Sequence, residues 1–402
     1  MRILWVKVGG LWPLNTGGRL RSFNIVSELS RSHRVTLLTT HSPEEDPKTL
    51  VAQLPQCERV ISVPCDVPKQ GSVRFGLALV RSWLSHYPVD LWKWRVPALL
   101  HEVRRHLASR EFDLCVADFL TAIPNVPLAG PIPIILFEHN AEHVIWTRLS
   151  QLETRPLYRP LLALESKKMR RFEAQACARV SLTIAVSEAD REVLAADAPG
   201  AKVRSIPTGV DVSYFTSNGA HELPAGLVFT GAMDWYPNED AMLYLVEAIL
   251  PLIRREVSQA SLVVVGRNPS PRLRTAAAEA GVHVTGTVDD VRPYVADAAV
   301  YVVPLRIGGG TRLKIFEALA MGKAVVSTMV GAEGLPLIPG EHFIQADGPA
   351  DFAKAVVSLL RNPLRRRELG VAGRRLVEER YSWPSVAREF EARCREVANH
   401  AR

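Results

Sequence analysis

The stretch AAVYVVPLRIGGGTRLKIFEALAMGKAVVST, residues 298–328, decides the fold predicted for this chain. Its apolar, β-branched run at 300–303 predicts a strand, and the three glycines at 308–310 end that strand. Apolar residues then recur at helical spacing as far as Gly322, and a second strand is predicted at 324–327. This order of strand, glycine loop, helix and strand predicts an α/β fold.

The glycine loop places the start of the predicted helix, with its free backbone N–H groups, where an anion can approach closely. Arg312 and Lys314 add two positive charges at this end, and Glu317 lies one turn further along the same face. Cations suit a diphosphate, and a carboxylate accepts hydrogen bonds from both hydroxyls of a ribose diol. The trio therefore predicts a nucleoside-diphosphate site, although a solvated helix face has the same composition. A Walker loop is excluded because alanine follows Gly322-Lys323.

Residues 304–327 resemble the donor-binding segment of the retaining glycosyltransferases of family 4, and GGGTRLKIFEALAMGKAVV is similar to a subgroup associated with bacterial exopolysaccharide synthesis. The resemblance implies a GT-B fold, which is two facing Rossmann-like α/β domains with a cleft between them. It also implies metal-independent transfer of a sugar from a nucleoside-diphosphate sugar, UDP- or GDP-linked, to an acceptor hydroxyl with retention. The acceptor would be a saccharide or a lipid-linked saccharide. Glu317 matches the family glutamate that binds ribose, whereas Gly309 stands where most members carry the glutamate that contacts the donor sugar.

The same resemblance gives roles to single residues. His139, in FEHNAEH, matches a family histidine that contacts the donor sugar. Most family members hold the diphosphate with an Arg and a Lys after the first strand of the second domain, but the segment there in this chain, GAMDWYPNED, contains neither. Arg312 and Lys314 would therefore stabilise the departing diphosphate instead. With Glu317 these form the expected catalytic set, and no protein nucleophile or base is needed because the leaving phosphate takes the acceptor proton. The other residues expected around the donor are Gly17, Gly18, Arg21, Gly231, Gly266, Arg267, Val288, Gly308, Gly309, Gly310 and Thr311.

Polar residues also follow two predicted strands, 113–118 and 131–137, and ligands gather at the carboxyl ends of strands in open α/β sheets. Asp118 ends the first strand and His139 follows the second, although a lone histidine there is more often structural. Glu142, His143 and Arg148 come next and are expected on the acceptor side. Without the resemblance, the glycines at 17–18 indicate only a tight turn.

Three segments are predicted: an acceptor-side Rossmann-like domain at 1–215, a donor domain at 216–380, and a final helix at 381–402 that returns to the first domain. A linker is expected at 216–226, where TSNGAHELPAG interrupts the pattern. Ser187 is expected to cap a helix, with Asp190 in the box position.

Composition excludes several classes of protein. The 402 residues, 47% hydrophobic and 23% charged, are enough for two packed domains and do not indicate disorder. Five scattered cysteines without a CxxC pair favour a reducing cytosol over a disulfide framework or a zinc site. No metal is expected at Asp289-Asp290, which begins a helix. The net charge of +7 brings no compact basic stripe, so nucleic acid is not an expected partner.

No run is long enough to span a membrane, and the apolar N-terminal run is too short for a signal peptide, so the chain is expected to be soluble or peripheral. Residues 71–110 combine Trp83, Trp92 and Trp94 with an excess of basic residues. That mixture is typical of a segment that binds an anionic membrane surface. It is equally typical of a helical face that packs through tryptophan and carries arginines on its exposed side.

Two further functions stay open. A nucleotide-sugar epimerase on the same fold would convert the donor with no acceptor present. A noncatalytic protein would bind the donor without hydrolysing it, which the glycine at position 309 leaves open.

Overall fold

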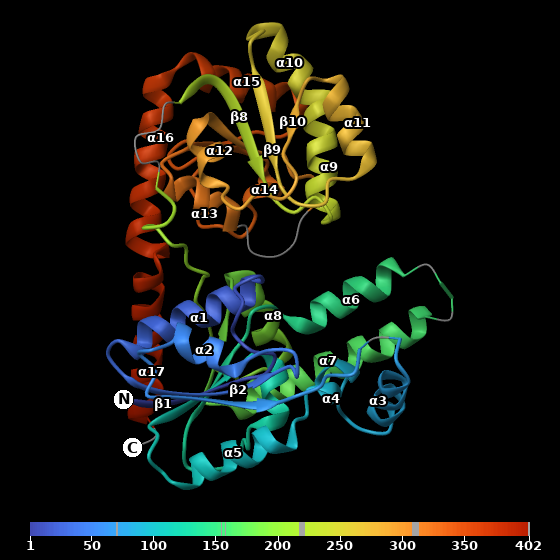
Figure 1. Cartoon of the computed structure of the whole chain (residues 1–402), viewed down its shortest axis with the longest axis vertical. Coiled ribbons are helices and arrows are strands. Elements are labelled where there is room, and N and C mark those ends of the chain that lie inside the picture. The colour runs from blue at the N-terminus through green and yellow to red at the C-terminus, as the bar shows by residue number, and fades with distance from the viewer. Residues whose placement is uncertain (70, 154, 157, 217–221, 308–312, 401–402) are drawn as a thin grey trace. The chain divides into compact units, whose positions relative to one another are not determined.

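The computed structural model describes residues 1–69, 71–153, 155–156, 158–216, 222–307 and 313–400. The chain divides into two compact units, which Figure 1 shows. Unit 1 contains Met1–Pro207 and Val386–Arg402, and unit 2 contains Thr208–Ser385. Each unit is built on one parallel sheet covered by helices, as the alternation of apolar strands and helical segments predicts.

Within the described residues, the sheet of unit 1 has seven strands in the order β3-β2-β1-β4-β5-β6-β7, all parallel. Its central strands are mostly apolar because both faces of the sheet are buried, and Lys7 and Asp118 stand at the carboxyl ends of β1 and β4. The strands are β1 (Arg2–Lys7), β2 (Arg34–His41), β3 (Arg59–Pro64), β4 (Leu114–Asp118), β5 (Ile134–Phe137), β6 (Leu182–Ala185) and β7 (Val203–Ser205).

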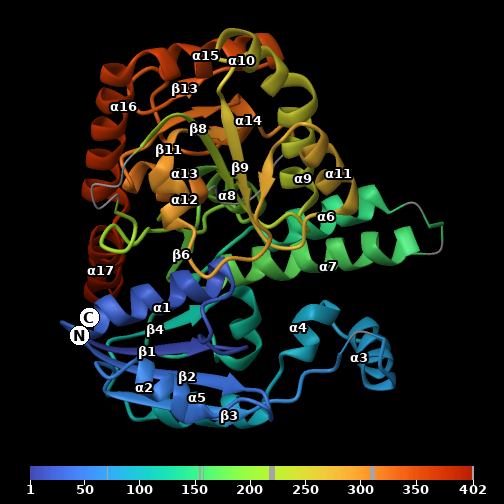
Figure 2. The same ribbon diagram turned by 45° about the horizontal axis from the view of Figure 1, so that its top comes forward.

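Several helices of unit 1 begin at a side chain that caps the helix. The Thr16 hydroxyl accepts a hydrogen bond from the Arg19 amide at the start of α1, and Ser187 accepts one from the Asp190 amide at the start of α8, which confirms the predicted cap. Helices α6 and α7 lie side by side, as Figure 2 shows. The helices are α1 (Gly17–Ser30), α2 (Pro47–Gln53), α3 (Val73–Trp83), α4 (Val89–Lys93), α5 (Pro97–Ala108), η1 (Leu120–Asn125), α6 (Glu142–Leu152), α7 (Tyr158–Arg179) and α8 (Glu188–Asp197).

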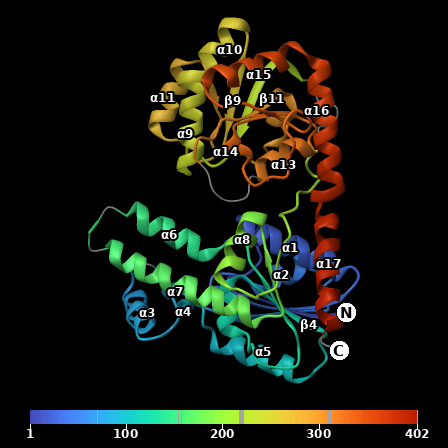
Figure 3. The ribbon, with the colours of Figure 1, turned by 180° about the vertical axis from the view of Figure 1, so that it is seen from behind.

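The last helix, α17 (Trp383–His400), belongs mostly to unit 1. The Phe390 ring lies 5.5 Å from the Trp5 ring, and His33 Nε2 lies 3.1 Å from the Glu391 carboxylate. Figure 3 shows this part of α17 beside the sheet of unit 1. The apolar face of the helix is therefore buried against the first half of the chain, although it is last in sequence.

In the part of unit 2 that the structure describes, six parallel strands have the order β10-β9-β8-β11-β12-β13. The stretch 298–303 is the buried strand β11, next to both β8 and β12. The predicted strand at 324–327 is confirmed as β12. The strands are β8 (Leu223–Thr230), β9 (Ser261–Val265), β10 (His283–Val284), β11 (Ala298–Val303), β12 (Ala324–Ser327) and β13 (Ile344–Gln345).

The helices of unit 2 cover this sheet, and two π-helical segments, η2 and η3, lie within longer helical runs. Helix α13 follows β11, as the helical spacing after the glycine loop predicts. The elements are α9 (Tyr236–Tyr244), η2 (Leu245–Ile249), α10 (Leu250–Glu256), α11 (Pro271–Glu279), α12 (Arg292–Asp297), α13 (Leu313–Ala320), α14 (Met329–Ala332), α15 (Pro349–Arg361), α16 (Pro363–Leu376) and η3 (Val377–Tyr381).

Two parallel sheets of seven and six described strands confirm the predicted α/β fold of two Rossmann-like halves. The predicted linker at 216–226 is wrong at its end, because β8 already begins at Leu223. Gly226 pairs with Ser261 there, so a segment with the composition of a loop is recruited by its neighbouring strand.

The described residues contain no helix that is long and apolar enough to cross a membrane. Nor do they contain a cluster of three or more His, Cys, Asp or Glu side chains arranged to hold a metal ion. All five cysteines are free thiols.

Candidate functional site

The first candidate site lies in unit 2, where β8 and β9 end. Gly231 follows β8 and Gly266 follows β9, and the Gly231 amide donates to the Val265 carbonyl at 2.9 Å. A Cβ on Gly266 would lie 1.7 Å from the Gly231 carbonyl oxygen, so the two chain segments pass as closely as glycine permits. Both predicted glycines therefore share one place at the carboxyl edge of the sheet.

Lys314, near the start of α13, meets this edge. Its ammonium group donates a hydrogen bond to Asn238 Oδ1 at 2.8 Å and lies 4.0 Å from the centre of the Phe229 ring. A Cβ on Gly231 would lie 2.7 Å from Lys314 Nζ, so a side chain at that position would require Lys314 to move. The structure thus brings Gly231, Gly266 and Lys314 together, as a diphosphate site requires.

Glu317 lies one turn further along α13 and is half-buried. Burial raises the pKa of its carboxyl to about 7, against an opposing effect of Lys314. The charge of Glu317 acts on Tyr301 of β11, whose hydroxyl shares a hydrogen bond of 2.5 Å with Thr230 and whose pKa is raised mainly by burial. Glu317 can accordingly exchange a proton near neutral pH.

The other donor residues predicted in unit 2 are less tightly placed. Arg267 is exposed, with its guanidinium 3.4 Å from the Asp234 carboxylate, and Val288 packs at the margin of the core. The rest of the predicted loop, Gly308, Gly309, Gly310, Thr311 and Arg312, lies outside the described residues.

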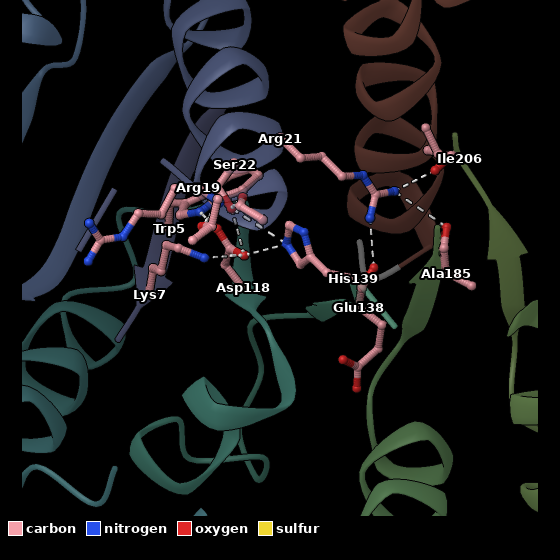
Figure 4. A network of polar contacts seen from close by, with 12 residues as sticks. Trp5, Lys7, Arg19, Arg21, Ser22, Asp118, Glu138, His139, Ala185 and Ile206 are labelled. Atoms are coloured by element: carbon pink, nitrogen blue, oxygen red, sulfur yellow. Dashed lines mark hydrogen bonds and ion pairs between the residues drawn. The ribbon is translucent and has the colours of Figure 1, made fainter. Parts of the chain in front are cut away.

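The second candidate site lies in unit 1, around Asp118 at the end of β4 (Figure 4). Its carboxylate is fully buried and accepts hydrogen bonds from Trp5 Nε1 at 2.8 Å, Lys7 Nζ at 3.1 Å and Ser22 Oγ at 3.0 Å. Burial raises the pKa of Asp118, but Lys7 and the hydrogen bonds outweigh it and hold the pKa well below its usual range. Asp118 is therefore a fixed negative charge at the carboxyl edge of the sheet.

His139 completes this network, which Figure 4 shows. Its Nε2 lies 2.9 Å from Asp118 Oδ1, so Nε2 carries the proton and Nδ1 keeps a lone pair. Burial lowers the pKa of His139 to about 3, against the opposing effect of Asp118. Nδ1 is buried and has no hydrogen-bond partner among the described residues. The imidazole is therefore neutral, and its buried Nδ1 keeps a lone pair that no described residue uses.

Phe119 holds the imidazole in place. Its ring stacks on His139 at 3.8 Å between ring centres, with an interplanar angle of 6°. Its backbone has φ +72°, a conformation that costs a residue with a side chain roughly 1–3 kcal/mol. A Cβ on Gly18 would lie 2.5 Å from this ring, so the predicted Gly18 is needed for packing inside unit 1.

Arg21 is placed differently from the expectation that it faces donor phosphates. Its side chain is 1% exposed, and its guanidinium donates to the backbone carbonyls of Glu138 at 2.8 Å and of Ile206. It also lies 4.3 Å from the centre of the Phe137 ring. In this structure Arg21 therefore ties α1 to the ends of neighbouring strands, while Gly17 beside it is exposed.

A cavity of about 230 Å³ opens next to this network in unit 1. Lys7 and Phe119 form part of its wall, and Trp94, Asp90 and Glu142 form another part. Burial, with the negative charges of Glu173 and Asp90, raises the pKa of Glu142 to about 7. An aromatic ring with two acidic side chains suits a saccharide, whose C–H face packs on the ring and whose hydroxyls donate to carboxylates.

The residues after Glu142 do not share this position. His143 is buried, with Nδ1 bound to Glu173 and Nε2 lying 3.2 Å from Asp197, so its expected place on the acceptor side is wrong. Arg148 is exposed, one and a half turns along α6. His143 serves instead to join α6, α7 and α8.

Asn238 and Lys7 are among the residues of these sites that the sequence-based set lacks. Asn238 hydrogen-bonds Lys314, and its only signal is its place in the segment that follows β8. Lys7 pairs with Asp118 although the residues are 111 apart in sequence, and a lysine inside an apolar strand was the available signal. Both contacts depend on which strands become neighbours, which periodicity does not specify.

Comparison with known families places two models along the chain. The model described as Glycosyltransferase Family 4 matches residues 17–214, and the model described as Glycosyl transferases group 1 matches residues 224–362. Together they account for most of unit 1 and most of unit 2.

Three relatives and one solved structure are similar to the chain. A phosphatidyl-myo-inositol mannosyltransferase of Mycobacterium leprae is 28% identical over 73% of this chain and 76% of its own length. An uncharacterised 44.6 kDa protein from the cps region of Klebsiella pneumoniae is 21% identical over 96% and 97%. A GDP-mannose-dependent phosphatidylinositol monomannoside mannosyltransferase of Mycobacterium tuberculosis is 30% identical over 47% and 54%. The sucrose-phosphate synthase of Thermosynechococcus elongatus has the same fold, with a TM-score of 0.71 at 17% identity over 99% of both chains.

Proposed function

The chain belongs to the glycosyltransferases, with a family 4 domain followed by a group 1 domain, and we propose that it transfers a sugar from a nucleoside-diphosphate sugar to an acceptor hydroxyl. The observation that carries this proposal is the cluster in unit 2 of Gly231, Gly266, Lys314 and Glu317 at the carboxyl edge of the sheet. A cation beside closely passing backbone suits a diphosphate, and a carboxyl one helical turn away suits a ribose diol.

In the proposed reaction, the bond between the anomeric carbon and the diphosphate oxygen breaks while the acceptor oxygen bonds to that carbon. Lys314, with Arg312 and the loop amides, stabilises the charge that grows on the departing diphosphate. The acceptor proton passes to the leaving phosphate oxygen, so no protein base is required. Retention at the anomeric carbon and independence from metal ions are parts of the proposal that the family resemblance supports.

His139 is proposed to contact the donor sugar through Nδ1, which accepts a hydrogen bond from a sugar hydroxyl. Its Nε2–H is held by Asp118, so the tautomer is set before any ligand binds. The cavity beside Trp94 and Glu142 is proposed to take the acceptor saccharide.

The names of the relatives support a proposal for the class of donor. One of them is named for GDP-mannose, and two are named as mannosyltransferases acting on phosphatidylinositol compounds. A GDP- or UDP-linked hexose and a saccharide or lipid-linked saccharide acceptor are therefore proposed here, in assembly of a bacterial polysaccharide or glycolipid, which the relative from a cps region also supports.

A peripheral position on an anionic membrane is proposed for helix α3. Val73, Leu77, Val80 and Leu84 recur at helical spacing and are between 51% and 86% exposed. Trp83 is 40% exposed beside them, and arginines flank the stripe. Figure 2 shows α3 at the periphery of unit 1. An apolar stripe flanked by cations suits the headgroup region of such a membrane.

Sedimentation with phosphatidylglycerol vesicles tests the α3 proposal. The double variant Leu77→Glu, Val80→Glu should lose vesicle binding, whereas Leu364→Glu, Val371→Glu, which changes two exposed apolar residues of α16, should keep it. Equal binding by both variants would refute it.

Calorimetric titration with UDP-, GDP-, ADP- and dTDP-sugars, first without metal and then with magnesium, tests the proposed donor site. Because the carboxyl of Glu317 has a pKa of about 7 and its ionised form accepts from a diol, affinity should rise between about pH 6 and pH 8. Glu317→Gln should weaken binding about tenfold and remove this pH dependence. The control is Glu279→Gln, an exposed glutamate of α11, which should behave as the wild type.

Failure of every nucleotide sugar to bind the folded wild-type protein would remove the proposal. Conversion of the donor in the absence of an acceptor would indicate the epimerase instead. Tight binding without transfer or hydrolysis would indicate the noncatalytic protein.

A further inference from the structure

A second and larger cavity in unit 1, of about 390 Å³, lies away from the residues described so far. Leu128 lies in the segment that leads to the start of β5, and Arg179 ends α7 just before β6 begins. The cavity therefore lies toward the amino ends of these strands. Asp118 and His139 lie at the opposite, carboxyl edge of the same parallel sheet. Its volume falls within the range of roughly 300–1,000 Å³ that is usual for small-molecule sites.

The arginines that line this cavity give it a positive charge. Arg95, Arg104 and Arg179 all contribute to it, and no Asp or Glu is among its lining residues. Across the described residues, none of these three guanidinium groups forms an ion pair with a carboxylate. The Arg95 guanidinium lies over two aromatic rings, 4.9 Å from the centre of Tyr87 and 4.4 Å from the centre of Trp92. We call this cavity the arginine pocket.

Acidic partners are not lacking nearby. Arg105, next to Arg104, pairs with Glu102, and Arg170, on the same helix as Arg179, pairs with Asp197 at 2.6 Å. Three like charges around one cavity repel each other, and an anion placed among them relieves that repulsion. Guanidinium groups also offer paired N–H donors whose geometry matches phosphate oxygens.

The remaining wall combines apolar side chains with uncharged polar ones such as Asn125 and Gln175. Phe172 and Val96 are buried, and Leu100 is half-buried beside them. Asn125 fixes the wall by accepting from the Val96 amide at 2.7 Å and donating to the Trp94 carbonyl at 2.8 Å. A ligand that carries an apolar group next to its anionic group can therefore use both parts of the pocket.

We propose that the arginine pocket binds an organic phosphate, with the phosphate held by Arg95, Arg104 and Arg179 and the apolar part packed against Phe172 and Leu100. The ligand is either a lipid phosphate or a water-soluble phosphate ester, which share this chemistry. The lining residues of the arginine pocket are not among those proposed to bind the donor or the acceptor, so its occupation does not require the transfer reaction.

The test is calorimetric titration of the full chain at low salt with two probes, dihexanoyl phosphatidic acid and inorganic pyrophosphate. The pocket variant is Arg104→Ala, Arg179→Ala. The control variant is Lys167→Ala, Arg171→Ala, which removes the same charge from exposed positions of α7. All four side chains are exposed, so circular dichroism should show both variants folded.

Each removed guanidinium should weaken phosphate binding about tenfold, so the pocket variant should bind about 100-fold more weakly than the control variant. Pyrophosphate also meets the proposed nucleotide site in unit 2, and for that reason each probe is read as the difference between the two variants. Tighter binding of phosphatidic acid than of pyrophosphate identifies the ligand as a lipid phosphate. Equal binding of the two probes identifies it as a water-soluble phosphate ester. Equal affinity of the two variants for both probes, or no saturable binding at millimolar concentration, would overturn the proposal.

Discussion

Acid should destabilise this protein through His139 in a way that one substitution removes. In the folded state burial lowers the pKa of His139 to about 3, whereas the unfolded histidine titrates at 6.5. Below pH 6.5 the unfolded chain therefore binds a proton that the folded chain does not bind, and stability falls as the pH is lowered toward 3. Each pKa unit corresponds to about 1.4 kcal/mol, so the 1.5 units between 6.5 and pH 5 predict a loss of about 2 kcal/mol from this residue.

Urea unfolding at pH 7.5 and pH 5, for the wild type and His139→Gln, measures this loss. A glutamine amide can still donate to Asp118 but does not titrate, so the variant should lose about 2 kcal/mol less than the wild type between the two pH values. Ser22→Ala is the matched control: it removes one hydrogen bond to Asp118, costs roughly 1 kcal/mol at both pH values, and keeps the imidazole.

Equal losses of stability by His139→Gln and the wild type between pH 7.5 and pH 5 would refute this prediction. That result would mean that the imidazole is protonated in the folded protein, with Nδ1–H bonded to a group or a water molecule. The proposed role of Nδ1 as an acceptor for a sugar hydroxyl would then also be lost.

Three further substitutions test the packing of both sites by urea unfolding. Gly266→Ala should destabilise unit 2 by roughly 3 kcal/mol or more, because the new Cβ would lie 1.7 Å from the Gly231 oxygen; a fully stable variant would show that the strand ends can separate. Asp118→Ala should lower the free energy of unfolding by roughly 3–5 kcal/mol, because Lys7, which is 2% exposed, would lose its carboxylate partner. A smaller loss of stability would mean that water reaches Lys7. Glu138→Gln should stabilise the protein at pH 8 and leave its stability unchanged at pH 4. Burial raises the pKa of the Glu138 carboxyl, so the contribution of this residue to wild-type stability is present below pH 4.5 and is lost as the pH rises. An equal effect of the substitution at both pH values would contradict this.

Much of the fold is readable from local pattern. The apolar runs at 300–303 and 324–327 are confirmed as strands β11 and β12, and the helical spacing between them is confirmed as α13. These elements are predictable because burial on both faces of a parallel sheet demands continuous apolar residues, and burial of one helical face demands a period near 3.6. The linker is not predictable in this way, because Leu223–Gly226 extend β8 only through pairing with a distant strand.

In the candidate sites too, some features follow from the local sequence and others only from the tertiary structure. The sequence by itself determined the residue types at the strand ends, including Gly231, Gly266 and His139, and the lysine at position 314 near the start of α13, because turns, anions and hydrogen bonds restrict which side chains can stand there. Only the tertiary structure decided which of them face a site and which face the interior. Arg21 has the charge of a phosphate ligand, yet its guanidinium is committed to the backbone carbonyls at the ends of neighbouring strands. Strand order sets such partners, and strand order results from packing between segments far apart in the chain, which no local pattern of residues encodes.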